Sequence, residues 1–292
     1  MSTDVQTPPP VRPVAELREV QGPSALGGGS RRFFDLLKLI SVTEFKRVYF
    51  GTVLGYLWSL LRPLMLFGVL LLVFTQVFRV GSNKVEYYPV FLLMGIVLYT
   101  FFSEATGNAV TSVVSQEGVV RKTQFPRAVI PLATVITSLF NLILNLIIVL
   151  VFILAFGVSP AWSWLLFPVA LAFLFVGTAG MAMALSALYV RFRDTAIIWV
   201  VAAQVFLYLT PILYPVNALG EETKERLLMI NPLSVIFEQV RVWVLHESQA
   251  PTAVQAAGGW AGLIPAAVIY VGVVAFGAWY FNREAPRIAE AL

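Results

Sequence analysis

The sequence predicts an all-α integral membrane protein with six transmembrane helices, an N-terminal amphipathic interface helix before them, and short gate helices on the outer face. Of the 292 residues, 59% are hydrophobic and only 12% are charged, whereas charged residues make up about 25% of a soluble domain. Apolar runs of about 20 residues, enough to cross about 30 Å of hydrocarbon, recur along the chain. We therefore expect one membrane domain, covering residues 51–292.

Residue types that build catalytic and metal sites are scarce. The chain has no cysteine and a single histidine, His246, which excludes disulfides, thiolate metal sites and cysteine nucleophiles. The only aspartates are Asp4, Asp35 and Asp194, so no Asp-x-Asp pair is present to hold the metal of a sugar nucleotide. The net charge of +4 is too small to indicate a nucleic-acid partner. We expect no catalytic residue, no metal and no cofactor in this chain.

The first 30 residues contain five prolines and a Gly-Gly-Gly-Ser run, without apolar periodicity. This composition predicts a disordered tail, residues 1–30, on the cytoplasmic side. A signal peptide is not expected, because a long polar stretch precedes the first apolar run and no small-residue cleavage site follows one.

Residues 31–50 are predicted to form an amphipathic helix, which would lie in the membrane interface. Its apolar face consists of Phe33, Leu36, Leu37 and Ile40, and its charged face of Arg31, Asp35 and Lys38. Ser41-Val42-Thr43-Glu44 matches a capping box, so we expect a second helical segment to start there. Such a helix could be a simple anchor or a functional interface element, and the pattern alone leaves both open.

The apolar runs define six predicted spans. The third and the fourth have 29 residues each, about 43 Å as straight helices, so we expect them to tilt, kink or project beyond the bilayer. The six predicted spans are residues 57–78, 88–107, 128–156, 162–190, 196–214 and 260–281.

The distribution of basic residues predicts the orientation. An even number of spans leaves both termini on one side of the membrane. With both termini in the cytoplasm, 15 Lys and Arg residues lie inside and five outside. We therefore predict a multi-pass protein of the cytoplasmic (inner) membrane with both termini cytoplasmic.

The segment between the second and third predicted spans, residues 116–127, is mixed in charge and ends near Pro126, which disfavours helix in the residue before it. A short cytoplasmic helix parallel to the membrane fits this segment. It would be a solvated connector, the more common case, or a docking surface for a partner.

Two prolines, Pro211 and Pro215, lie at the end of the fifth predicted span and are expected to break or kink it. The loop of about 45 residues that follows has apolar stretches too short to cross a membrane. These stretches are residues 227–230 and 233–245, separated by Asn231-Pro232. We expect two short helices that dip into the outer face or lie on it.

The predicted spans contain few charged residues. Arg62 and Glu104 are the candidates, and each lies near the inner end of its span, where an interfacial charge can reach water. Ion-coupled carriers keep charges at mid-membrane for their function, although each costs about 2.5–3.5 kcal/mol on insertion scales. Proton or sodium coupling is therefore disfavoured.

Aromatic residues are abundant, 39 of 292. Many are expected to face lipid or to form interface belts. Aromatic faces also offer sugar rings a flat partner that fixes no hydrogen-bond register, which suits a sliding chain. The candidate channel and gate residues are Tyr56, Trp58, Tyr99, Phe102, Phe206, Tyr208, Pro211, Tyr214, Pro215, Asn231 and Pro232.

Five segments, taken in order, resemble one family. They are GTVLGYLWSLLRPL at residues 51–64, Phe125-Pro126-Arg127 followed by Pro131-Leu132, Arg193-Asp194, TPILYP at residues 210–215, and Asn231-Pro232. Together they resemble the ABC-2 type permeases of polysaccharide export, the group that includes O-antigen and teichoic acid exporters. The resemblance covers about residues 31–283 and leaves the tail outside.

The resemblance implies a homodimer of six-span subunits that works with two copies of a separate ABC ATPase. The ATPase would bind ATP and Mg, and the complex would export a polyprenyl-diphosphate-linked glycan through the lipid membrane. The chain agrees with this division, because it has no Gly-x-x-x-x-Gly-Lys-[Ser/Thr] phosphate loop. By resemblance, residues 31–47 are the interface helix, residues 116–125 the coupling helix and residues 215–259 the outer gate.

Two sets of residues follow from these assignments. The expected ATPase-coupling residues are Glu117, Gly118, Val119, Arg121 and Lys122. The expected entrance residues, cations that would hold the lipid diphosphate, are Arg31, Arg32, Lys38, Lys46 and Arg47. The alternative role of these cations is to set topology alone.

Three other functions remain open at this point. A membrane glycosyltransferase acting on lipid-linked sugars would need carboxylates or a metal site at the membrane face, and the shortage of aspartate argues against it. An ABC-2 permease for lipids or drugs would be distinguished by neighbouring genes that lack polysaccharide assembly functions. An ion-coupled carrier is weakened by the nearly uncharged spans.

Overall fold

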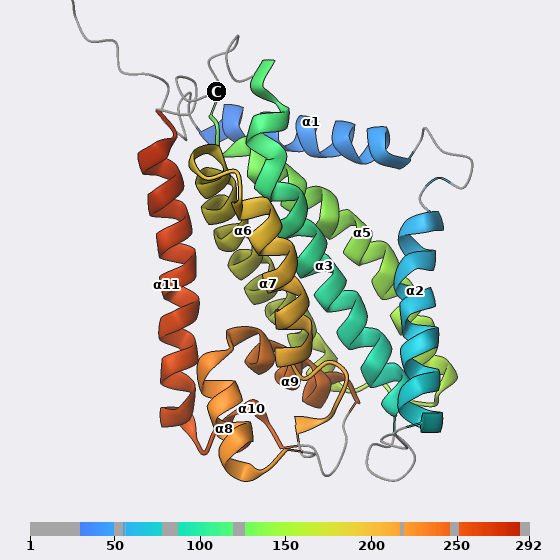
Figure 1. Ribbon diagram of the computed structural model, residues 1–292. Helices are drawn as coiled ribbons and strands as arrows, with labels where there is room; N and C mark the ends of the chain where they lie inside the picture. Colours follow the sequence, from blue (N-terminus) through green and yellow to red (C-terminus); the bar gives the residue numbers. More distant parts are fainter. Residues whose placement is uncertain are drawn as a thin grey trace, which may run out of the picture.

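The computed structural model describes residues 30–49, 55, 57–77, 87–118, 126–216, 219–245 and 251–286, and this part of the chain is helical with no strand (Figure 1). The predicted tail, residues 1–30, lies outside the described residues except for Ser30. The elements are α1 (Ser30–Tyr49), α2 (Leu57–Leu72), the π-helical η1 (Val73–Val77), α3 (Tyr88–Ser115), α5 (Val129–Ala155), the 3₁₀-helical η2 (Trp162–Leu166), α6 (Phe167–Arg191), α7 (Thr195–Leu209), α8 (Glu221–Ile230), α9 (Pro232–Leu245), α10 (Ala253–Ala256) and α11 (Trp260–Glu284). The all-α prediction is confirmed.

Five stretches of helix among the described residues are long and apolar enough to cross a membrane. They match the predicted spans one to four and six, and cover Leu57–Gln76, Tyr88–Ser115, Val129–Ala155, Trp162–Arg191 and Trp260–Glu284. The fifth predicted span, residues 196–214, is shorter in the structure. α7 has 15 residues and ends at Leu209, because Thr210 adopts an extended backbone ahead of Pro211.

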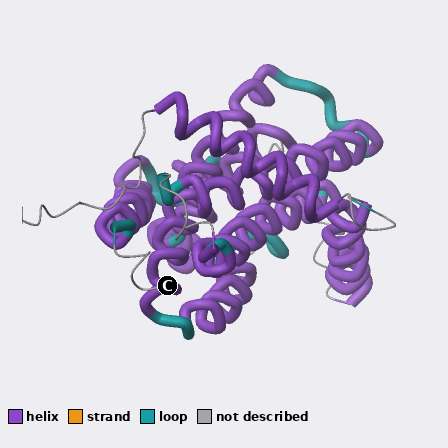
Figure 2. Tube along the Cα trace, turned by 90° about the horizontal axis from the view of Figure 1, so that it is seen from above, coloured by secondary structure: helices purple, strands orange, loops and turns teal. Residues whose placement is uncertain are grey.

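α3 is the central helix of the bundle. In its most apolar stretch 78% of the residues are buried, against 11% in α2 and 17% in α11. α3 packs mainly on α5 and α6, while α2 and α11 stand at the two sides of the bundle (Figures 1 and 2). Because neighbouring helices cover most of α3, the one side left open is informative about function.

α1 lies across one end of the bundle (Figure 1), which we call the α1 end. It shows the two faces expected from the sequence. Phe33 and Leu37 are buried in a cluster with Val129 at the start of α5 and Phe281 near the end of α11. The exposed residues of α1 are mostly charged or polar, together with Phe34 and Leu39, so the helix is attached through the face that carries Phe33 and Leu37.

The predicted second helix start at residues 41–44 is wrong, because α1 continues unbroken from Ser30 to Tyr49. The Ser41 hydroxyl donates to the Leu37 carbonyl one turn earlier over 2.6 Å, instead of accepting from a new first turn. Glu44 lies 3.4 Å from Arg47 on the next turn. Both residues of the expected capping box therefore have partners inside one continuous helix.

α8 and α9 form a bent pair at the opposite end, which we call the α9 end (Figure 1). Their axes differ by 111° at a break that falls on Asn231, the position expected from the sequence. α8 begins at Glu221, six residues before the predicted stretch. A proline at the first position of α9 suits this break, since its missing N–H is not needed there.

A buried ion pair within α9 lies on the face of that helix that contacts α3. The Glu238 and Arg241 side chains are 3.5 Å apart, and each is at most 2% exposed. The guanidinium group of Arg241 also lies 4.9 Å from the centre of the Phe91 ring on α3, a cation–π distance. α9 is thus fastened to the central helix by a charged group, although apolar side chains surround it.

Candidate functional site

One side of α3 carries polar residues that remain accessible in the described chain. They recur every three or four positions, which places them on one helix face. The polar members are Thr100, Ser103, Glu104, Asn108, Thr111 and Ser115, and Gly107 exposes backbone on the same face; all seven are half-exposed or exposed. We call this set the α3 polar stripe. Polar groups facing hydrocarbon without partners are costly, so this face is suited to water or a polar ligand.

An ion pair borders the α3 polar stripe. Arg62 of α2 lies 3.5 Å from Glu104, with side-chain exposures of 79% and 28%. The two residues are separated by 42 positions in the sequence. From the sequence alone, each was expected to be an independent charge at the membrane interface. Arg62 lies in the second turn of α2 and Glu104 in the interior of α3, so both belong to helices long and apolar enough to cross a membrane. Charged residues in spans mark substrate paths more often than structural sites.

Exposed apolar surfaces occur on α2 and α7, which both contact α3. On α7, Ile197, Val200 and Val201 are 60–71% exposed. Trp58 on α2 and Tyr208 near the end of α7, both expected channel residues, are 52% and 58% exposed. A membrane helix as exposed as α7 contacts either lipid or a second polypeptide.

Tyr99 and Phe102 were expected to line a channel, but they lie in the core between α3 and α7, 6% and 4% exposed. The Tyr99 hydroxyl donates to the Ala203 carbonyl of α7. Phe102 packs against Trp199 and Phe206, with ring centres 6.1 and 6.5 Å apart. These aromatic residues join α7 to α3, and the α3 polar stripe lies on the other side of the helix.

The residues expected to form the gate do come together at the α9 end. The Asn231 amide donates to the Thr210 hydroxyl over 3.1 Å and its oxygen accepts from the Leu233 N–H, also over 3.1 Å. Asn231 thus connects the tip of the bent pair to the end of α7 and caps α9 at the same time. Pro211 and Pro215 are buried, and Pro232 is half-buried.

Protein side chains receive the backbone groups freed beyond α7. The Tyr88 hydroxyl of α3 donates to the Leu213 carbonyl over 2.8 Å, and the Tyr214 hydroxyl donates to the Tyr208 carbonyl over 3.0 Å. Such irregular backbone at membrane depth requires partners of this kind.

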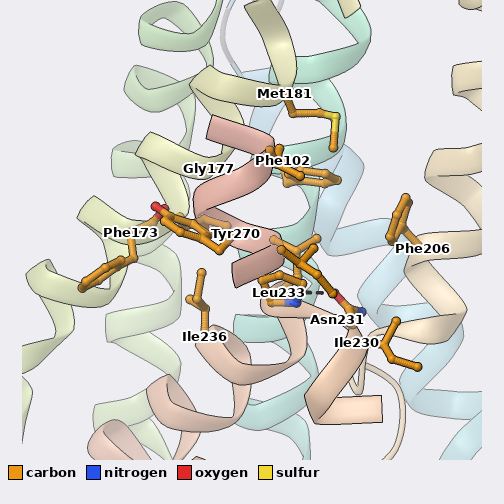
Figure 3. Close-up of a pocket in the computed structure, with 14 residues that line it drawn as sticks. Phe102, Phe173, Gly177, Met181, Phe206, Ile230, Asn231, Leu233, Ile236 and Tyr270 are labelled. Carbon is orange, nitrogen blue, oxygen red and sulfur yellow. Dashed lines mark hydrogen bonds between the residues drawn. The ribbon is translucent and has the colours of Figure 1, made fainter. Parts of the chain in front are cut away.

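A cavity of about 210 Å³ lies above this tip. Figure 3 shows Ile230, Asn231 and Leu233 on one side and Phe102, Phe206 and Met181 on the other. Its lining is almost wholly apolar, with Asn231 turned to Thr210 and away from the space. The tip of the bent α8–α9 pair therefore contacts the bundle at Thr210 but leaves a cavity beside it.

The remaining expected residues are only partly described. Glu117 and Gly118 follow directly after the end of α3 at the α1 end. Val119, Arg121, Lys122 and Tyr56 lie outside the described residues. Among the described residues no group of three His, Asp or Glu side chains is arranged to hold a metal ion.

The five expected entrance cations are all exposed on α1, but they extend over 17 residues, about 24 Å along the helix axis. Arg31 and Lys38 share one side, and Arg32 and Lys46 share another. Arg47 is beside Glu44. One diphosphate can reach only a subset of these groups.

The α3 polar stripe was not predicted from the sequence. Its signal was present, because polar residues recur at helical spacing from Thr100 to Ser115 in an otherwise apolar run. The predicted span stopped at residue 107, in the middle of this pattern, whereas α3 continues to Ser115.

The described chain is therefore a multi-pass helical membrane protein with a polar face and a bent helix pair at one end. Residues 35–245 match the ABC-2 type transporter family, and the chain belongs to it. It is 30% identical over 211 residues to a Myxococcus xanthus protein named O-antigen export system permease protein RfbA, a match covering 72% of this chain and 80% of the relative. It is also 30% identical over 202 residues to a Klebsiella pneumoniae protein of the same name, covering 69% and 76%.

These matches confirm the family inferred from the five sequence segments. Membership makes the chain the membrane-embedded permease of an ABC transporter, a class whose ATP hydrolysis belongs to an ATPase partner. The chain itself is not an enzyme.

Proposed function

We propose that this permease exports a polysaccharide across the cytoplasmic membrane, as a glycan linked to a polyprenyl diphosphate. The names of the relatives support a polysaccharide cargo. The observation that carries the proposal here is the α3 polar stripe, since a hydrophilic cargo that crosses the bilayer needs a hydrophilic face along its path.

In a single subunit the α3 polar stripe is not covered by the other helices that the structure describes. The proposal therefore includes a second copy of the chain, which would cover it. Two subunits meeting through the exposed apolar faces of α2 and α7 would enclose the two α3 polar stripes in one path. Two copies of an ABC ATPase would bind ATP and Mg and drive the cycle. No nucleic acid has a role in this assembly.

The α1 end is assigned to the cytoplasm. The excess of basic residues on the predicted inner side supports both termini being cytoplasmic. Glycan would then enter near α1 and leave past the bent pair of α8 and α9. Trp58 and Tyr208 are both exposed, and we expect their rings to contact sugars where the contact between the subunits borders the path.

Variants of the α3 polar stripe test the proposal directly. Asn108→Leu and Thr111→Leu would replace polar groups of the path by apolar ones and are expected to lower glycan export by the complex reconstituted with its ATPase. Ala275→Leu, at an exposed position of α11 outside the stripe, is the matched control. Normal export by both stripe variants would exclude this face as the path.

The coupling segment is tested by a loop exchange. Replacing Gly118-Val119-Val120 with a flexible Gly/Ser stretch is expected to lower glycan-stimulated ATP hydrolysis and export while leaving membrane insertion intact. Unchanged stimulation would remove Glu117 to Lys122 from the mechanism.

The entrance cations are tested in the pairs that α1 defines. Neutralising Arg31 with Lys38, or Arg32 with Lys46, is expected to weaken the glycan-stimulated ATPase more than the orientation of the chain. An effect restricted to orientation would leave these residues with a topological role only.

The gate is tested by thiol labelling, because the chain contains no cysteine. Cysteine introduced at Tyr208, Tyr214 or Leu233 should change its labelling by a membrane-impermeant reagent when ATP or glycan is added. Cysteine at Val268, an exposed residue of α11, should not. Identical labelling in every state would mean that this end does not move.

A further inference from the structure

α6 and α11 pack backbone to backbone at one level of the bundle. A Cβ added at Gly180 would lie 2.7 Å from the Cα of Val274, and one added at Gly277 would overlap the Gly180 carbonyl oxygen. Glycine at both positions allows this approach, because any side chain would push the helices apart.

Towards the α9 end the same two helices separate. The Tyr270 ring fills the space beside Gly177, where a Cβ would come within 2.8 Å of it, and meets Phe173 edge-on with ring centres 6.0 Å apart. Small residues follow, Ala170 on α6 and Ala266 and Ala267 on α11. The large rings hold the helices apart and the alanines do not fill the gap.

The result is a crevice of about 560 Å³, which we call the α6–α11 crevice. α9 forms its third wall through Val235, Ile236, Gln239 and Trp243, which share one helix face. The buried Arg241 lies on the opposite face of α9. An occupant of the crevice would therefore contact α9 on the side opposite to the Arg241 contact with Phe91 of α3.

The crevice lining is almost wholly apolar, and its polar side-chain groups are those of Gln239, Tyr270, Trp243 and Trp260. It contains no charged side chain. The Gln239 side-chain oxygen accepts from the Ala253 N–H over 3.4 Å, and the Tyr270 hydroxyl donates to the Phe173 carbonyl over 2.7 Å. Water needs two to four polar partners to occupy a cavity, and a void of this size would leave its walls without contacts. The lining thus suits a hydrocarbon.

We propose that the α6–α11 crevice binds an acyl chain of a bilayer phospholipid. The crevice continues the lipid-facing surface of the bundle, since Phe173, Ile264 and Val271 at its rim are 54–62% exposed. Trp162 and Trp260, 88% and 78% exposed at the α9-end termini of the same two membrane-crossing segments, are placed to anchor at the headgroup level. An acyl chain that extends from this headgroup level into the hydrocarbon would reach the crevice directly.

Tyr270 sets the depth of this site. The crevice and the 210 Å³ cavity of Figure 3 share Phe173, Pro232, Ile236 and Tyr270, so these side chains form the wall between them. An acyl chain would end at this wall, with the tip of the bent pair on the other side. The lipid would thereby contact the face of α9 that lines the crevice. This contact would not require the transported glycan.

Tryptophan fluorescence tests the proposal without any transport assay. The chain has seven tryptophans, and Trp243 lines the crevice while only half-exposed. In a variant that keeps Trp243 and carries Phe at the other six positions, vesicles of phosphatidylcholine with brominated acyl chains should quench Trp243 strongly relative to the unbrominated lipid. The reference is a variant that keeps only Trp199, 6% exposed between α3 and α7, which should be quenched little.

Filling the crevice distinguishes an acyl chain inside it from lipid that merely passes by. Ala267→Phe in the Trp243-only variant should reduce the quenching toward the Trp199 level, and the smaller Ala267→Leu should reduce it less. Ala275→Phe, exposed on the same helix but outside the crevice, should leave it unchanged. Trp243 quenching no stronger than that of Trp199, or quenching unaffected by both Ala267 variants, would overturn the proposal.

Discussion

The Asn231 amide donates a hydrogen bond to the Thr210 hydroxyl over 3.1 Å, and this contact joins the tip of the bent helix pair to the end of α7. Both side chains are buried, Thr210 completely. Each residue directly precedes a proline, Thr210 before Pro211 and Asn231 before Pro232. The two helix breaks of this end are thus bonded to each other, so a movement of the tip and a movement of α7 are expected to be coupled.

Thr210→Val should loosen the tip, because it leaves the buried Asn231 amide without this acceptor. The expected loss of unfolding free energy is about 1–3 kcal/mol, seen as a lower thermal unfolding midpoint of the purified protein. Faster labelling of a cysteine at Leu233 should accompany it. Thr210→Ser keeps the hydroxyl and should behave like the parent; equal destabilisation by both substitutions would point to packing instead of the hydrogen bond.

Arg62 and Glu104 should show a small coupling energy. Because the Arg62 side chain is 79% exposed, we expect about 0.2–1 kcal/mol from a double-mutant cycle of Arg62→Gln and Glu104→Gln. Thermal unfolding at low and high salt measures it, and salt should reduce the coupling. Strictly additive single variants would show that the pair does not tie α2 to α3.

Gly277→Ala should destabilise the bundle, since the new methyl group would overlap the Gly180 carbonyl oxygen. Overpacking of this kind costs about 1–3 kcal/mol, measurable as a lower unfolding midpoint. Gly272→Ala is the matched control on the same helix, where an added Cβ meets nothing within 4 Å. It should be neutral or slightly stabilising, and a similar loss in both variants would contradict the tight contact.

Arg241→Met should be among the most damaging single changes outside the apolar core. It leaves Glu238 charged at 1% exposure, for which we expect a loss of about 3–5 kcal/mol. The double variant Glu238→Gln with Arg241→Met should recover part of this loss. Arg226→Met removes the partner of the exposed Glu222 and is expected to cost at most about 0.5 kcal/mol. Comparable effects at the two positions would mean that Arg241 is not held as described.

Much of the fold could be predicted from local patterns in the sequence. The length of apolar runs located the spans at residues 57–78, 128–156, 162–190 and 260–281 to within a few residues. The period of Phe33 and Leu37 identified α1, and Asn231-Pro232 marked the break between α8 and α9. These features depend on side chains that are neighbours in the sequence.

The candidate site could be predicted only in part from the sequence. Aromatic content suggested Tyr99 and Phe102 as channel residues, but an aromatic ring suits a helix interface as well as a sugar. The structure buries both against α7. Conversely, the polar residues of the α3 polar stripe were overlooked because each alone is unremarkable in sequence.

By itself, the sequence determined that the protein is helical, embedded in a membrane and broken at particular prolines, since hydropathy, helical period and the missing proline N–H act within one or two turns. Only the tertiary structure decided that Arg62 meets Glu104, that Asn231 bonds to Thr210, and that α6 and α11 separate into a crevice. Those outcomes depend on how helices distant in the sequence pack. Packing is set by the combined shapes of many side chains, and no single segment contains that information.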